Sequence, residues 1–154
     1  MAHYIFKQLQ FVRNNTLTEV SELTEQQIIL MPPGFRNNIK WHLGHIYVVQ
    51  EKFAFDLTGE EPEYPTSFTE WFGTGSSPSD WKEEVLPTLE ELITLLKQQI
   101  LRIEQTFSSN LNKHILPYTT STGLTIASVQ QLLSFCLYHE GMHFGTIKSL
   151  KRLL

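Results

Sequence analysis

The chain has 154 residues, of which 41% are hydrophobic and 18% charged, and this length and composition suit one domain, 1–154, with a sizeable core. Its net charge is -4 and its Lys and Arg residues are scattered, so the sequence predicts neither a nucleic-acid-binding surface nor a membrane-surface patch. No stretch has the length and hydrophobicity of a membrane span, and the first residues lack the order of a signal peptide, so we expect a cytoplasmic protein.

Two amphipathic helices are predicted in the first third of the chain. Apolar side chains recur at helical spacing from residue 3 to about residue 30, which predicts one long helix. The sequence Met-Pro-Pro-Gly at 31–34 ends it, because proline cannot donate into the helix and disfavours helical backbone in the residue before it. The second helix is predicted over 39–57, with Asn37 or Asn38 as its N-cap.

Residues 59–86 show no periodicity and are rich in Pro, Gly and Ser. They nevertheless hold several aromatic side chains, which disordered linkers usually lack: Tyr64, Phe68, Trp71, Phe72 and Trp81. We therefore expect this segment to be a crossover that packs along the domain, so that the third helix runs parallel to the second. Its aromatic residues either pack as ordinary loop side chains or line the mouth of a pocket.

The remaining elements complete a bundle. A third helix is predicted over 88–107, and the segments 115–119 and 123–125 flank a Thr-Ser-Thr turn that indicates a short hairpin. The last helix is predicted over 126–152 and ends in basic residues, as helix C-termini prefer. Four long amphipathic segments and one long crossover between the second and third predict an all-α four-helix bundle, a fold that often builds metal sites between facing helices.

Two histidines lie four residues apart in the last predicted helix, on a stripe that is otherwise apolar. His139 and His143 therefore project from one face, about one turn apart. A single core histidine would more often hydrogen-bond a neighbour, but two adjacent buried imidazoles are commonly satisfied by binding one metal ion. With Glu140 they also match H-E-x-x-H, the zinc-protease pattern in which the glutamate is the general base. The eleven residues after His143 contain no His, Asp, Glu or Cys, so the downstream third ligand of such proteases is missing.

A third ligand must therefore come from upstream, and the second helix offers His42 and His45. On a helical wheel His42 lies nearer the middle of the apolar face and His45 on its flank, so periodicity leans slightly towards His42. Cys136, one turn before His139, is a further alternative ligand, although a buried free cysteine is usually a small hydrophobe. As the only cysteine it also excludes an intrachain disulfide. Two other histidines are expected at the surface: His3 and His114.

Residues 38–46 (Asn-Ile-Lys-Trp-His-Leu-Gly-His-Ile) and 139–147 (His-Glu-Gly-Met-His-Phe-Gly-Thr-Ile) resemble the DinB/YfiT-like family of metalloenzymes. The resemblance covers the whole chain in its length, four helices, long second connection and histidine positions. It implies an up-down-down-up bundle, frequent homodimers, and a metal held by His45, His139 and His143 rather than by His42. Some members of that family are transferases that use low-molecular-weight thiols such as bacillithiol, mycothiol or glutathione.

Three neutral imidazoles leave a divalent ion such as zinc or nickel with an open position. Water bound there titrates near pH 7 and a bound thiol is deprotonated. The leading hypothesis is thus a metal-dependent thiol S-transferase acting on a small-molecule substrate. The alternatives are a metal-dependent hydrolase and a non-catalytic metal-binding or stress-related bundle. Glu140 points about 100° away from His139 on the helix, and is a candidate base, a partner that orients a ligand, or a partly solvated side chain.

Overall fold

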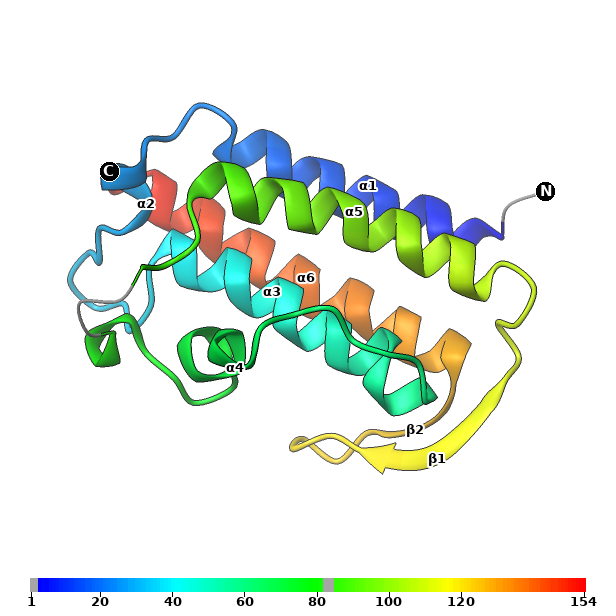
Figure 1. Ribbon diagram of the computed structural model, residues 1–154. Helices are drawn as coiled ribbons and strands as arrows, with labels where there is room; N and C mark the ends of the chain where they lie inside the picture. Colours follow the sequence, from blue (N-terminus) through cyan, green and yellow to red (C-terminus); the bar gives the residue numbers. More distant parts are fainter. Residues whose placement is uncertain (1–2, 82–84) are drawn as a thin grey trace.

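The computed structural model describes residues 3–81 and 85–154, and its four long helices form a bundle. They are α1 (Tyr4–Val20), α3 (Ile39–Ala54), α5 (Leu89–Phe107) and α6 (Val129–Lys151). Helices α1 and α6 run in one direction and α3 and α5 in the other (Figure 1), so the predicted up-down-down-up order is confirmed. Helix α3 packs against α5 and α6, and α1 packs against the same two helices.

Short elements occupy the connections. They are α2 (Glu25–Ile28), η1 (Asp56–Thr58), α4 (Thr66–Phe72), η2 (Pro78–Asp80), β1 (His114–Thr119) and β2 (Thr125–Ser128). The two strands pair antiparallel with Tyr118 opposite Ile126, which confirms the predicted hairpin. No helix in the described parts of the chain is long and apolar enough to cross a membrane.

The prediction of one helix from residue 3 to about 30 was wrong. Helix α1 ends at Val20, and α2 starts afresh because Thr24 is the N-cap of a capping box with Gln27. Thr24 accepts a hydrogen bond from the Gln27 backbone, and the Gln27 side chain accepts one from the Thr24 backbone. Apolar periodicity continues through this break, so periodicity alone could not locate it.

The bounds of two other helices also differ from prediction. Helix α3 ends at Ala54 and is followed by the 3-10 turn η1, while its N-cap is Asn38, whose Oδ1 accepts from the Trp41 amide at 2.8 Å. Helix α6 begins at Val129 rather than at residue 126, because Thr125–Ser128 pair with β1. Ser128 then caps α6 by accepting from the Gln131 amide.

The crossover packs along the bundle through α4, which lies against α3 (Figure 1). The ring of Phe72 sits so close to Gly44 that a Cβ atom there would overlap it. Trp81 packs edge-on against the same ring, with 5.8 Å between the ring centroids. Loop packing therefore accounts for part of the aromatic content of this segment.

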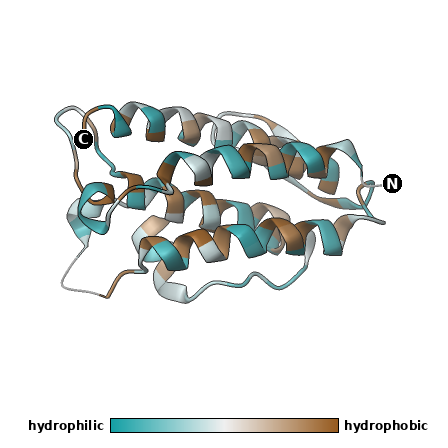
Figure 2. Cartoon of the chain, turned by 90° about the horizontal axis from the view of Figure 1, so that it is seen from above, coloured by the Kyte–Doolittle hydropathy of each residue, from teal (hydrophilic) through white to brown (hydrophobic). Residues whose placement is uncertain are grey.

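The bundle interior is mainly apolar but contains buried polar groups, one of which is a layer around Arg13. Apolar and polar residues alternate along each long helix (Figure 2), as amphipathic helices require. In the polar layer the Nε and Nη2 atoms of Arg13 donate to the two carboxylate oxygens of Glu140 at 2.8 and 3.0 Å. Arg13 also donates to the side chains of Gln50 and Gln99 and to the carbonyl of Leu96. All four long helices thus contribute to this layer.

Candidate metal centre

Three histidines meet where α3 packs against α6. Each of His45, His139 and His143 offers one ring nitrogen within 4.8 Å of those of the other two. The Nε2 atoms of His139 and His143 are 3.2 Å apart. Two imidazole nitrogens bound to one tetrahedral zinc ion lie about 3.3 Å apart, given zinc–nitrogen distances of 2.0–2.1 Å. The pair on α6 is therefore spaced as two corners of such a site.

Contacts with the crossover hold His45 in place. Its Nδ1 lies 2.6 Å from the carbonyl oxygen of Phe72, so Nδ1–H donates and Nε2 keeps its lone pair. Trp41 stacks on the imidazole, with ring centroids 4.4 Å apart and planes at 13°. The Trp41 indole is itself fixed, because its Nε1 donates to Ser76 at 2.9 Å.

His42 lies outside the group of three although it touches it. Its Nδ1 is 2.8 Å from Nδ1 of His143, whereas His139 approaches His143 at Nε2. The two nitrogens of an imidazole point in different directions, so one ion bound at Nε2 of His143 cannot also bind Nδ1 of His42. The structure therefore groups His45 with the pair on α6, against the slight preference of the helical wheel for His42.

Burial keeps the four imidazoles neutral. Burial in the first place, and then the neighbouring histidines, lower the pKa of His143 to about 2 and that of His139 to about 3. Burial and His45 likewise lower the pKa of His42 to about 4. The pKa of His45 is lowered by burial, against the opposing effect of its bond to Phe72. At neutral pH each of these imidazoles is therefore uncharged and keeps a lone pair on one ring nitrogen, so the cluster does not repel a cation.

Neither Cys136 nor Glu140 belongs to the group of three. Burial, followed by the charge of Glu140, raises the pKa of Cys136 to about 12, so its thiol stays protonated. Glu140 is only 1% exposed and both its oxygens accept from Arg13, so the partly solvated position considered for it was wrong. The sequence offers no sign of this pairing, because 127 positions separate the two residues.

His3 and His114 are exposed as expected, His3 as the N-cap of α1 and His114 as the first residue of β1.

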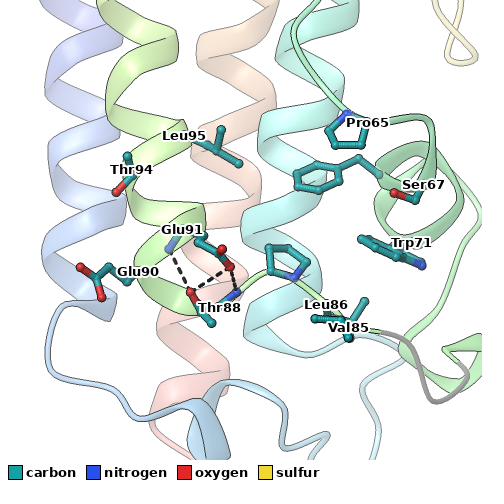
Figure 3. Close-up of a pocket in the computed structure, with 12 residues that line it drawn as sticks. Pro65, Ser67, Trp71, Val85, Leu86, Thr88, Glu90, Glu91, Thr94 and Leu95 are labelled. Carbon is teal, nitrogen blue, oxygen red and sulfur yellow. Dashed lines mark hydrogen bonds between the residues drawn. The ribbon is translucent and has the colours of Figure 1, made fainter.

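Two cavities lie against the bundle helices. One, of about 720 Å³, lies between α4 and the first turns of α5 (Figure 3), and the histidines do not line it. Trp71 is on one side and the capping box of Thr88 and Glu91 on the other. A second cavity, of about 530 Å³, lies between the hairpin and α6 and is lined by Phe135. The Phe135 ring stacks on that of His139, with centroids 6.2 Å apart, so Phe135 lies between this cavity and the histidine cluster.

The fold and the cluster together define a class of protein: a four-helix bundle whose buried histidines are spaced to hold a divalent metal ion. The chain belongs to the DinB superfamily, whose family model matches residues 8–147, and this confirms the resemblance noted in the sequence. The crystal structure of a conserved protein from Enterococcus faecalis has the same fold, with a TM-score of 0.70 at 14% identity over 97% of this chain and 94% of that one. No protein with a curated description matches the chain.

Proposed function

We propose that this protein is a metal-dependent enzyme whose divalent ion is bound by Nε2 of His45, His139 and His143. The observation that carries the proposal is the approach of the three ring nitrogens within 4.8 Å, from two facing helices. The donor set fits the ion, because burial keeps the imidazoles neutral and the bond to Phe72 directs Nε2 of His45 inward. Zinc or nickel suits three imidazoles.

The reaction we propose is transfer of a low-molecular-weight thiol, such as bacillithiol, to an electrophilic small molecule: the sulfur bonds to the electrophilic carbon, a leaving group such as chloride departs from that carbon, and the thiol proton is released to solvent. A divalent ion held by these histidines would lower the pKa of a coordinated thiol, so that the sulfur would be nucleophilic at neutral pH. The chain's own residues hold the ligands in place: Trp41 stacks on His45, and Phe135 packs against His139. The cavity beside Phe135 has a mixed apolar and polar lining, which is suited to an electrophile that carries both a carbon skeleton and polar groups. We assign no proton transfer to Glu140, because Arg13 occupies both its oxygens.

The first experiment measures metal content by elemental analysis in tag-free protein, for wild type and for His45→Ala, His143→Ala and His42→Ala. After reconstitution at saturating metal we expect about one ion per chain in wild type and in His42→Ala, and little in the other two variants. Little metal in reconstituted wild type would contradict the proposal and leave the histidines as core residues.

The second experiment tests the reaction. The zinc-loaded and nickel-loaded proteins are each mixed with bacillithiol or glutathione and an electrophile such as monochlorobimane, and conjugate formation is followed by fluorescence. We expect metal-dependent conjugation that His45→Ala abolishes. Turnover of ester substrates without added thiol would favour a hydrolase instead, and an ion with no exchangeable water would favour a non-catalytic bundle. We also propose that this enzyme is a cytoplasmic homodimer. Sedimentation of the same samples measures its oligomeric state.

A further inference from the structure

His42 and His143 face each other through the same kind of nitrogen. Their Nδ1 atoms are 2.8 Å apart, a hydrogen-bond distance, and both side chains are buried. A hydrogen bond between two neutral imidazoles needs one proton, so one of the pair donates and the other accepts. Which one donates decides whether His143 can bind a metal ion.

Two proton arrangements satisfy the distances. In the first, His42 donates to Nδ1 of His143, and His143 then carries its own proton on Nε2, which donates to His139 at 3.2 Å. In the second, Nδ1–H of His143 donates to His42 and Nε2 of His143 is free. Only the second leaves a lone pair on the nitrogen that faces His139 and the cluster.

We infer that His42 is a positioning residue for the metal site. His42 accepts a hydrogen bond from Nδ1–H of His143, and this bond fixes the orientation of the His143 ring and the tautomer in which Nε2 is free to bind the ion. This inference rests on the metal site proposed above. His42 then carries its own proton on Nε2. Histidine ligands of metal sites commonly donate their second nitrogen to such a partner.

The packing around His42 fits this role. Trp41 stacks face-on against His45, and its ring also meets His42 edge-on, with centroids 5.3 Å apart and planes at 88°. One helix, α3, thus supplies the ligand His45 and, one turn earlier, the side chain that orients a ligand of α6. The partner of His45 is a backbone carbonyl, which no substitution removes, so the partner of His143 is the one that mutagenesis can test.

The test compares His42→Leu, which removes the acceptor, with His42→Gln, whose side-chain oxygen can still accept from His143. His114→Gln is the matched control, because it removes an exposed histidine far along the chain in β1. Zinc affinity is measured at pH 7 by competition with a chromophoric chelator. We expect the affinity of His42→Leu to fall about 10-fold to 100-fold, the usual effect of losing such a partner, while His42→Gln stays within about threefold of wild type.

Long-range nitrogen–proton NMR of the zinc-loaded wild type reads the tautomers directly and depends on no variant. We expect a proton on Nδ1 of His143 and on Nε2 of His42. Zinc bound through Nδ1 of His143, or a His42→Leu variant that binds zinc as tightly as wild type, would overturn the inference while leaving the proposed function intact. Equal losses in His42→Gln and His42→Leu would also overturn it. Absence of zinc binding in wild type would overturn both.

Discussion

At the scale of single residues, the candidate site depends on neutral imidazoles whose direction is fixed by their neighbours. His45 is directed by the Phe72 carbonyl, and the position of Phe72 depends in turn on Gly44, the residue beside His45 on α3. The Gly-His pair in the sequence thus has a physical explanation: the glycine lets α4 approach, and α4 orients the histidine.

Replacing Gly44 by alanine should therefore weaken metal binding without touching a ligand. The new Cβ would overlap the Phe72 ring, and forcing that ring away costs about 1–3 kcal/mol of unfolding free energy and displaces the carbonyl that accepts from His45. Urea unfolding and zinc titration of Gly44→Ala should show both losses, with zinc affinity down about 10-fold.

Gly145→Ala is the matched control, because Gly145 is an exposed helical glycine with no atom within 4 Å of the added Cβ. Alanine there should raise the free energy of unfolding by about 0.5–1 kcal/mol, as expected for a helix interior. Equal stability changes in the two variants would contradict the close packing of Phe72 on α3.

The lowered histidine pKa values predict that the metal-free protein loses stability in acid. Burial sets the pKa of His143 at about 2 and of His139 at about 3 in the folded state, below the ordinary value of 6.5 that applies to the unfolded chain. Below pH 6.5 the unfolded chain therefore binds protons that the folded protein excludes, so the free energy of unfolding falls as the pH drops. Each such histidine contributes up to about 1.4 kcal/mol per pH unit.

Urea unfolding with a chelator present, at pH 7 and pH 5, measures this effect. The difference in the free energy of unfolding between the two pH values should be smaller in His143→Gln than in wild type, by the contribution of about one histidine. A wild-type protein equally stable at both pH values would show that the cluster is not desolvated as its burial indicates.

Part of this site is predictable from the sequence. The spacing of His139 and His143 follows from helical periodicity alone, so the pair was readable. The choice between His42 and His45 is not predictable from helical periodicity, because it depends on which face of α3 is covered by α4. Helix α4 belongs to a segment without periodicity. The family resemblance supplied what the helical wheel could not.

At the scale of elements, the buried layer around Arg13 fixes how the helices pair. Arg13 of α1 bonds side chains of α3, α5 and α6, and it is completely buried. Such a charge is tolerated only where all its donors find acceptors, so sliding α1 along its neighbours would leave a buried charge unpaired.

Removing one partner of this ion pair should destabilise the bundle strongly. Glu140→Gln leaves the guanidinium of Arg13 buried without its counter-charge, and Arg13→Met leaves the carboxylate alone, so each should cost about 3–5 kcal/mol. The free energy of unfolding of the double variant Arg13→Met with Glu140→Gln should fall by much less than the sum of the losses in the two single variants. Urea unfolding of all four proteins gives the coupling free energy, and additive losses would contradict a direct interaction.

The helix bounds show which local interactions the sequence revealed. The capping box of Thr88 with Glu91 begins α5 within one residue of the predicted start, because the acidic first turn and the cap are both readable. The equivalent box at Thr24 was hidden by apolar residues that continue the stripe of α1. The start of α6 was misplaced because strand pairing with β1, a tertiary interaction, overrides local helix preference.

At the scale of the whole molecule, the proposed ion would link two antiparallel helices, α3 and α6, which the chain connects only through residues 55–128. His45 lies on α3 and the other two ligands on α6, while the unfolded chain keeps no such arrangement. Ligand binding to the folded state alone raises its stability by mass action. The metal site should therefore contribute to the stability of the bundle as well as to its chemistry.

Zinc at 100 times its dissociation constant should raise the free energy of unfolding by about 2.7 kcal/mol. For a chain of this length that corresponds to a rise in the melting temperature of roughly 5–10 °C. Thermal unfolding followed by circular dichroism, with zinc and then with excess chelator, should show a rise that the chelator reverses. His45→Ala should show no rise in melting temperature with zinc, because the two remaining imidazoles are both on α6 and cannot bridge two helices. His114→Gln should respond like wild type. A zinc response that survives in His45→Ala would mean that the ion binds to α6 alone and does not bridge the helices.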